Sequence, residues 1–400
     1  MKGFLVYISW RITVLFVWGF SIAFCVEAQI TRLPYADTTS GNYFGTSVAL
    51  DGKRAVVGAS GERSCDAGSG AAYIYEVNDS TESWMQVARL VPQDCEKGLA
   101  FGKKVAIDGS VVLVAASREF FGDEHSNAVY VYEEIEPGKW IQTERLTGDT
   151  REQREGAAGA DVAVYHDRAL FTTSGNLSPG NEIDGAAYIY KKNAGKWILE
   201  QRLVGSGNIQ RGVFGGNAAL YQNFLAVASS SYFGRGAGSV YLFGLDQSGS
   251  WSEVARLGGI QDFFISLDLY ENELIIGQAR SGSRESGQAT LFAQDSTGVW
   301  EKTATLEPPT PYRKGAFGTE VAIYEDRALV VGYDEQLHLN YNVDRVVYIY
   351  ARDNDQWQYQ GIIDIGEAAF GSSIDLHGNT ALIGAASGVN AGKAYVVKIP

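Results

Sequence analysis

Short hydrophobic runs recur along this chain in units of roughly fifty residues. The units start near residues 44, 101, 158, 214, 263, 317 and 370, most of them at a phenylalanine. The successive spacings are 57, 57, 56, 49, 54 and 53 residues. A repeat of this length is typical of β-propellers, in which each unit forms one four-stranded blade.

Each unit contains four segments with the pattern of short strands. The first alternates apolar and small residues, as at 48–50, and ends in a polar pair such as Asp51-Gly52, which suits a two-residue hairpin. A compact apolar run follows (56–57), then a Tyr-x-Tyr segment (73–75), then a segment that begins at Trp84 and ends in Arg-Leu. An exposed aromatic binding strip is the alternative interpretation of these tyrosines, but a pattern present in the repeats usually serves the repeated core. The sequence therefore predicts an all-β fold, a seven-bladed β-propeller of four-stranded antiparallel blades.

The last unit lacks a fourth strand, because the chain stops at Pro400 directly after the third. Residues 30–33 carry the Arg-Leu ending of a fourth strand and precede the first unit. We therefore predict that this N-terminal strand completes blade seven. The ring would then be closed and its last edge paired.

The first 28 residues have the features of a signal peptide. Residues 12–26 form an unbroken apolar run, and residues 26–28 place small residues where a signal peptidase cleaves. A run of fifteen residues falls short of the ~20 needed to cross a bilayer. We expect an exported protein (secreted, periplasmic or at the cell surface) with one propeller domain, residues 29–400, and no membrane span after cleavage. An uncleaved anchor is the alternative.

Composition narrows the range of partners and cofactors. The formal net charge of −14 argues against a nucleic-acid partner, since phosphate binding requires a basic face.

Cleavage of the signal would leave two cysteines, Cys65 and Cys95, and two cysteines in an exported chain suggest one disulfide. The two loops that carry them should lie on one face of neighbouring blades; two free thiols are the alternative. We expect a monomer.

Phe44-Gly45 with Gly58-Ala59 and Phe370-Gly371 with Gly384-Ala385 are the best copies of a motif that recurs at the unit boundaries. This motif resembles the FG-GAP repeats of the integrin α-subunit propeller, in their bacterial variant. The resemblance covers residues 30–399 and implies a seven-bladed propeller that meets its partners on one loop face.

The repeats also depart from that family. The proline of the Gly-Ala-Pro triplet is absent, Ala158 replaces phenylalanine in the third unit, and Phe264 replaces glycine in the fifth. Calcium loops of alternating carboxylates, which such repeats often carry, have no counterpart in the short first hairpins. We therefore predict no metal site and no cofactor.

Recognisable catalytic motifs are also missing from the sequence. The four histidines have no zinc-site spacing, and no nucleophile elbow or phosphate-binding loop occurs. We therefore predict a non-enzymatic protein with no catalytic residue.

The loops between the second and third strands differ most from unit to unit, and variable loops on a fixed scaffold commonly carry binding. They should emerge on one face. The candidate binding residues are Glu62, Arg63, Arg118, Asp123, His125, Asn181, Asp184, Tyr232, Arg235, Arg284, Asp334, His338 and Tyr341. For each one alone, a solvated loop residue is the alternative interpretation.

Three functions fit this pattern. The first is a secreted or cell-surface binding or adhesion module whose ligand is a protein or a glycan. The second is a carbohydrate-binding lectin, which would need equivalent sugar pockets in several units. The third is an enzyme with a site at the propeller axis, since one fold can host many activities.

Overall fold

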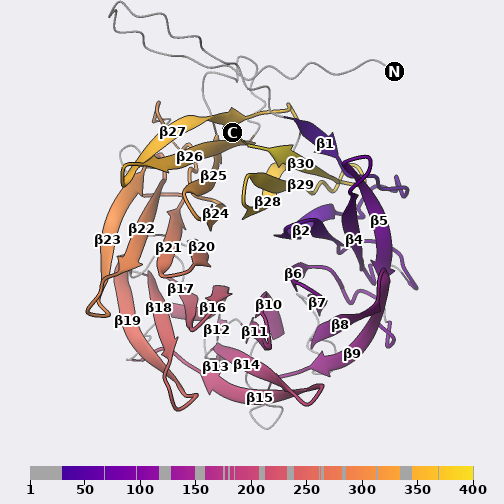
Figure 1. Ribbon diagram of the computed structural model, residues 1–400, viewed down its shortest axis with the longest axis horizontal. Coiled ribbons are helices and arrows are strands. Elements are labelled where there is room, and N and C mark those ends of the chain that lie inside the picture. The colour runs from indigo at the N-terminus through magenta and orange to yellow at the C-terminus, as the bar shows by residue number, and fades with distance from the viewer. Residues whose placement is uncertain are drawn as a thin grey trace, which may run out of the picture.

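A computed structural model describes residues 29–66, 68–95, 97–116, 128–148, 158–173, 176–178, 181–183, 185–206, 212–231, 238–260, 262, 265–281, 285–311, 314–333, 345–367 and 369–399. Seven four-stranded antiparallel sheets surround a common axis (Figure 1). The predicted seven-bladed propeller is therefore confirmed. The predicted signal peptide, residues 1–28, lies outside the described residues. In the part that is described, no helix is long and apolar enough to cross a membrane.

From the axis outward, the strands of each blade are called A to D. Blades 1 and 2 contain β2 (Phe44–Asp51), β3 (Arg54–Ala59), β4 (Ala71–Asn78), β5 (Ser83–Leu90), then β6 (Lys104–Asp108), β7 (Val111–Ala116), β8 (Ala128–Glu136) and β9 (Lys139–Leu146). Blades 3 and 4 contain β10 (Ala158–Tyr165), β11 (Arg168–Thr173), β14 (Ala186–Asn193), β15 (Lys196–Leu203), then β16 (Gly212–Tyr221), β17 (Phe224–Ser231), β18 (Gly238–Leu245) and β19 (Trp251–Ile260). Blades 5 and 6 contain β20 (Ile265–Tyr270), β21 (Glu273–Gln278), β22 (Gln288–Gln294), β23 (Trp300–Leu306), then β24 (Val321–Tyr324), β25 (Arg327–Tyr333), β26 (Arg345–Asp353) and β27 (Gln356–Ile363).

Blade 7 is assembled from both ends of the described chain, as predicted. Its strands are β28 (Phe370–His377), β29 (Thr380–Ala385), β30 (Lys393–Lys398) and, outermost, β1 (Ile30–Arg32) (Figure 1). Thr31 pairs with Val396, and Leu33, which is fully buried, donates its N–H to the Ala394 carbonyl at 2.9 Å. The N-terminal segment thus covers the free edge of β30 and closes the ring.

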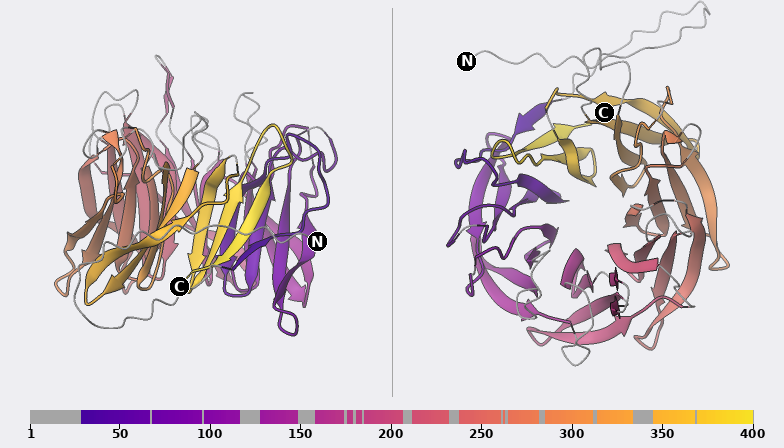
Figure 2. Two further views of the ribbon diagram at one scale, coloured as in Figure 1. Left: turned by 90° about the horizontal axis from the view of Figure 1, so that it is seen from above. Right: turned by 180° about the vertical axis from the view of Figure 1, so that it is seen from behind.

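The long B–C and D–A connections emerge on one face, here called the B–C face, and the A–B hairpins on the other, the A–B face. In blade 3 the B–C connection contains a small extra hairpin, β12 (Asn176–Ser178) and β13 (Asn181–Ile183). Seen from the side, it projects beyond the blades (Figure 2, left).

Phe-Gly and Gly-Ala pairs form the joint between consecutive blades. Gly102 has φ +89°, and a Cβ placed on Gly58 of the preceding blade would lie 1.9 Å from the Gly102 oxygen. The two backbones therefore meet at a distance that excludes any side chain. Phe101, fully buried, packs edge-on against Tyr130 of its own blade with ring centroids 5.4 Å apart. The phenylalanine thus fills its own blade, while the glycine contacts the neighbouring one.

Blade 3 replaces the missing phenylalanine from another strand. Where the other units have a valine or a similar residue in strand B, β11 has Phe171, which is fully buried. Its ring stacks on Tyr188 at 5.1 Å and lies 5.9 Å from Tyr190. The aromatic cluster is therefore retained although the sequence has Ala158 at the start of the unit.

Tyrosines of strand C also join neighbouring blades. The Tyr75 hydroxyl donates to the Pro34 carbonyl at 2.8 Å, and Tyr132 donates to Val91 at 2.6 Å. Each acceptor lies in the D–A connection that arrives from the preceding blade. These tyrosines belong to the core and its joints, as the repeated pattern predicts.

A disulfide adds a covalent link between blades 1 and 2. Cys65, in the B–C connection of blade 1, is bonded to Cys95, in the D–A connection to blade 2, and their Cα atoms are 6.3 Å apart. The bond fixes two connections on the B–C face to each other.

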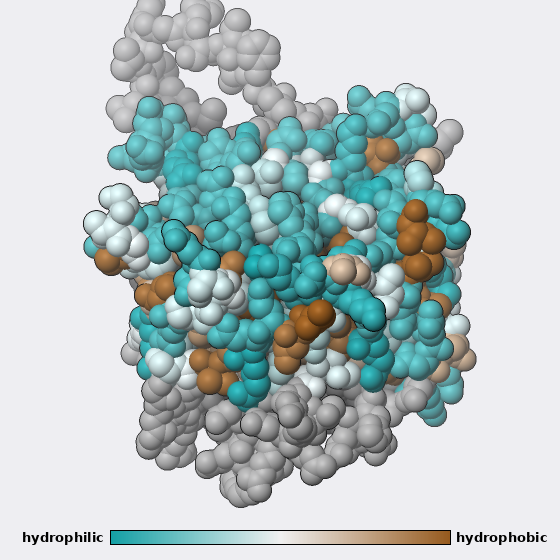
Figure 3. Space-filling model, turned by 60° about the horizontal axis from the view of Figure 1, so that its bottom comes forward, coloured by the Kyte–Doolittle hydropathy of each residue, from teal (hydrophilic) through white to brown (hydrophobic). Residues whose placement is uncertain are grey.

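Hydrophobic side chains on the outer wall are scattered. On the surface drawn in Figure 3 they form small separate groups within a mostly hydrophilic surface. Exposed examples on D strands are Met85, Ile141, Leu199 and Val254. The surface in this view therefore has no broad apolar patch of the kind that marks an obligate interface.

The glycine joint predicts a sharp difference between two Gly→Ala substitutions in strands. Gly58→Ala should lower the free energy of unfolding by about 3 kcal/mol, because its methyl group would overlap the Gly102 backbone. Gly258→Ala is the matched control, since its nearest atom, the Ser239 Oγ, lies 3.8 Å away. This variant should stay within about 1 kcal/mol of the wild type. Equal stability of both variants in denaturant titrations would contradict the joint.

Ring closure predicts that deletion of residues 29–36 lowers the melting temperature and causes association, because the edge of β30 becomes free. Size-exclusion chromatography and thermal unfolding measure both effects. As a point test, Leu33→Ala should cost roughly 2–5 kcal/mol. Leu199→Ala, at a position 40% exposed on another outer strand, should cost much less. A deletion variant that stays monomeric and equally stable would refute the closure.

The disulfide closes a loop with a sequence separation of 30 residues. The chain-entropy model gives it a contribution of roughly 3 kcal/mol. The double variant Cys65→Ser/Cys95→Ser should lose stability of that order in denaturant titrations. Mass analysis should find no alkylatable thiol in the unreduced, denatured protein that lacks residues 1–28; two such thiols would contradict the bond.

Candidate functional site

Two of the predicted binding residues have described side chains, namely Glu62 and Arg63. Asn181 lies in β13, but its side chain is outside the description. Also outside the described residues are Arg118, Asp123, His125, Asp184, Tyr232, Arg235, Arg284, Asp334, His338 and Tyr341.

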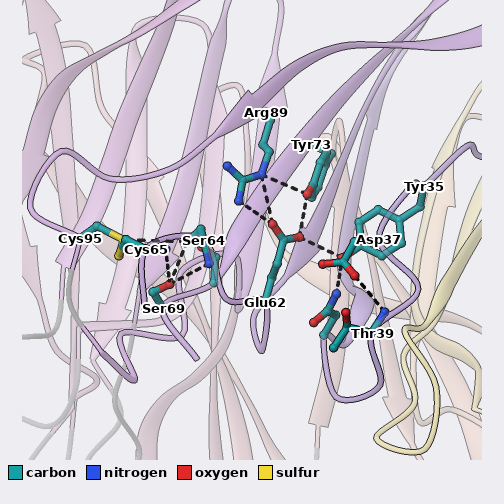
Figure 4. A network of polar contacts seen from close by, with 12 residues as sticks. Tyr35, Asp37, Thr39, Glu62, Ser64, Cys65, Ser69, Tyr73, Arg89 and Cys95 are labelled. Carbon is teal, nitrogen blue, oxygen red and sulfur yellow. Dashed lines mark hydrogen bonds and ion pairs between the residues drawn. A yellow bond between two sulfur atoms is a disulfide. The ribbon is translucent and has the colours of Figure 1, made fainter. Parts of the chain in front are cut away.

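Glu62 is the centre of a buried network under the B–C face of blade 1 (Figure 4). It is only 3% exposed. Arg89 donates to its Oε1 at 2.6 Å, while the hydroxyls of Tyr73 and Tyr35 donate to its Oε2 at 2.6 and 2.9 Å. Burial, followed by the nearby Glu62 charge, raises the pKa of both tyrosines, so both remain protonated donors. Glu62 therefore anchors the loop, and Tyr35 ties the N-terminal segment to it.

The next residues of this loop are held by a serine. Ser69, fully buried, accepts through its Oγ the backbone N–H groups of Ser64 and Cys65 at 3.1 and 3.2 Å (Figure 4). The Cys65–Cys95 bond fixes the same turn to the next blade. Arg63, between the Glu62 anchor and this turn, is exposed. Blade 1 thus presents an arginine on an ordered part of the B–C face.

A second candidate site, which the sequence analysis missed, is a cavity of about 430 Å³ on the propeller axis. Its wall is formed by strand A of every blade. Because side chains alternate along a strand, the fourth and the eighth residue of each unit point to the same side. The fourth residues, here called the upper level, are Ser47, Lys104, Asp161, Asn217, Ser266, Glu320 and Ser373. The eighth residues, here called the mouth, are Asp51, Asp108, Tyr165, Tyr221, Tyr270, Tyr324 and His377. The available signal was the polar residue at the fourth position of each unit.

Most of the polar groups on the wall have a structural role. Strand A is the inner edge strand of each blade, so the backbone N–H groups on its unpaired edge need hydrogen-bond acceptors. Asp161, Asp268 and Asp375 each accept an N–H from strand A of the next blade, at 2.9, 2.8 and 2.6 Å. Ser47 and Ser373 do the same at 3.1 and 3.0 Å. These side chains connect the inner edges of neighbouring blades.

Lys104 and Glu320 do not follow this pattern. The Lys104 Nζ lies 3.4 Å from the Asp161 Oδ1, and the Asp161 charge raises the pKa of Lys104. No hydrogen bond or ion pair joins the Glu320 carboxylate to a described residue. Burial raises the pKa of Glu320 to about 7. The upper level therefore has one cation, already paired with Asp161, and one carboxylate that makes no hydrogen bond or ion pair with a described residue, although the charges of Lys104 and Arg345 lower its pKa.

Two further carboxyl groups lie between the upper level and the mouth. Burial raises the pKa of Asp268 to about 6. Burial and then the Asp268 charge raise the pKa of Asp375 to about 7. The cavity is thus an acidic, poorly solvated space in which carboxylates are costly to ionise.

Aromatic rings from five consecutive blades line the mouth. The ring centroids are 4.8 Å apart from Tyr165 to Tyr221, 4.9 Å from Tyr221 to Tyr270, 4.5 Å from Tyr270 to Tyr324, and 4.5 Å from Tyr324 to His377. This row of rings is here called the tyrosine crescent.

Two aspartates occupy the rest of the mouth. Asp51 lies 3.7 Å from the His377 ring nitrogen, and Asp108 lies 3.1 Å from the His166 ring nitrogen. Aromatic faces and carboxylates together form a lining that suits positive charge. Among the residues that the structure describes, no group of three or more His, Cys, Asp and Glu is placed to hold a metal ion.

Comparisons with known proteins address the repeat itself. The family model described as "FG-GAP repeat" matches residues 28–75 and 84–132, which include most of blades 1 and 2. The comparison with curated proteins found no match. The joint between Gly58 and Gly102 lies within the matched residues, and the contact between Gly384 and Gly45 repeats it at blade 7. The FG-GAP repeat match thus falls on blades 1 and 2 of a chain whose overall architecture is a seven-bladed β-propeller.

Proposed function

We propose that the protein is a non-enzymatic binding or adhesion module of the cell surface or the extracellular space, and that it contacts its partner through the B–C face. The FG-GAP propeller fold suggests a protein-binding module. Export is part of the proposal, and the Cys65–Cys95 disulfide supports it, since such bonds persist in oxidising compartments.

The observation that carries the proposal is the contrast between the two faces. All seven A–B hairpins have two residues between their strands, whereas the B–C connections have six to twelve. The opposite face carries these A–B hairpins together with the C–D hairpins, which have two to five residues between their strands. The long and varied connections are therefore confined to the B–C face. Variable loops on a rigid scaffold are where recognition usually occurs.

The described part of the B–C face is also ordered in advance. The Glu62 network, the Ser69 turn and the disulfide fix the loop that carries Arg63. A loop that is already ordered pays less conformational entropy on binding. Arg63 is exposed there and supplies a charge to a partner.

The test uses fluorescently labelled protein lacking residues 1–28 and cells of the source organism. Saturable binding is expected, and Arg63→Glu should weaken it at least about fivefold, because a charge at an interface is reversed. The matched control is Lys53→Glu, which reverses a charge in the A–B hairpin of the same blade, on the opposite face. Equal loss in both variants, or no saturable binding, would contradict the proposal. A parallel glycan array separates a protein partner from a sugar.

A further inference from the structure

We infer that the axial cavity binds an extended aliphatic polyamine, which enters through the tyrosine crescent and places its ammonium groups beside carboxylates at successive levels. This site is separate from the B–C face and takes a different class of ligand. Its volume of about 430 Å³ falls within the range of small-molecule sites.

The carboxylates form a ladder along the axis. Asp161 and Glu320 occupy the upper level, Asp268 and Asp375 lie two residues further along strand A, and the mouth follows after two more. Two residues of a strand span ~6.6 Å. Ammonium groups separated by propyl or butyl spacers have a comparable separation. A linear polyamine therefore matches the ladder, whereas a compact cation would reach one level.

The Glu320 carboxylate indicates a cationic ligand independently of the spacing of the ladder. The corresponding side chains Ser47, Asp161 and Ser373 accept an N–H from the next blade, but the Glu320 carboxylate has no such bond to a described residue. A partly buried carboxylate that accepts no hydrogen bond from a described residue is costly to ionise in the empty protein. A bound ammonium group would supply the compensating charge.

The surrounding charges favour a cation over other ligands. The described wall of the cavity carries six carboxyl groups and one lysine. The charges of Lys104 and Arg345 lower the pKa of Glu320, whereas neighbouring carboxylates raise the pKa of Asp268 and Asp375. Lys104 is already paired with Asp161, so it does not offer an anion site. The described residues offer no cluster suited to a metal ion.

The tyrosine crescent suits both parts of a polyamine. Aromatic faces attract ammonium groups and also pack against methylene groups. Burial raises the pKa of Tyr221, Tyr270 and Tyr324, so their rings stay neutral and carry protonated hydroxyls. The mouth thus provides a contact surface for the spacer, with Asp51 and Asp108 completing the circle.

Isothermal titration calorimetry with spermidine at pH 8 and low salt tests the proposal on protein lacking residues 1–28. One spermidine per chain should bind, and Glu320→Gln should weaken binding about tenfold, the loss of one charge-assisted contact. Glu301→Gln is the matched control, because it removes one negative charge at an exposed position of β23. No spermidine binding, or equal affinity of both variants, would overturn the proposal.

The raised carboxyl pKa values predict the direction in which spermidine affinity changes with pH. Carboxyl groups with a pKa of about 6 or 7 are mostly protonated at pH 5.5 and mostly ionised at pH 8. Spermidine should therefore bind more tightly at pH 8 than at pH 5.5, and its binding between these values should release protons. Affinity that is unchanged or higher at pH 5.5 would contradict the ladder.

Thermal unfolding separates binding from folding. Without ligand at pH 8, Glu320→Gln should melt at least as high as the wild type, because a costly charge is removed, and spermidine should raise its melting temperature less. A markedly lower melting temperature of the empty variant would show a structural role and overturn the proposal. Tetramethylammonium is the second probe: if it binds as tightly as spermidine, the site is a single-cation cage and the polyamine is wrong.

Discussion

The close contact between glycines of neighbouring blades is the constraint on which this structure depends. A Cβ at Gly58 would lie 1.9 Å from the Gly102 oxygen, and a Cβ at Gly384 would lie 2.1 Å from the Gly45 oxygen. These contacts set how closely the blades pack around the axis. They also explain the Phe-Gly motif, because the phenylalanine side chain packs in the blade and the glycine allows the backbones of neighbouring blades to approach closely.

The same geometry creates the axial cavity. Strand A of each blade is an edge strand, and its neighbour in the next blade is too far away for a regular ladder. Polar side chains such as Ser47 and Asp375 therefore bridge the gap by accepting N–H groups across it. A polar lining follows from the need to satisfy the inner edges. Glu320 stands out because it occupies such a position without making the bridge to a described residue.

The two faces of the ring therefore offer different kinds of surface to a ligand. The B–C face carries long, varied connections, of which the blade 1 part is fixed by Glu62, Ser69 and the disulfide. The A–B face has short hairpins and the open mouth of an acidic, aromatic cavity. The two binding sites that we propose, for a macromolecule and for a small cation, therefore lie on different parts of one scaffold.

The sequence alone determined the number of blades, their four strands and the closure by residues 30–33, because each of these follows from a pattern repeated locally within about fifty residues. The pairing of Cys65 with Cys95 followed from the loops of consecutive blades. Other features depend on contacts between residues far apart in the chain. Phe171 replaces the missing aromatic ring of blade 3, and Glu62, expected on the binding face, is buried in a network.

The cavity is the clearest case of what only the tertiary structure decided. Asp375 accepts the Leu50 N–H across 325 residues of sequence. In a single unit, its carboxylate resembles any polar residue of a half-exposed strand. Its poor solvation, its raised pKa and its place in a ladder arise only when seven inner strands converge on one axis. Repeats encode the blade, whereas the chemistry at the axis depends on closing the ring.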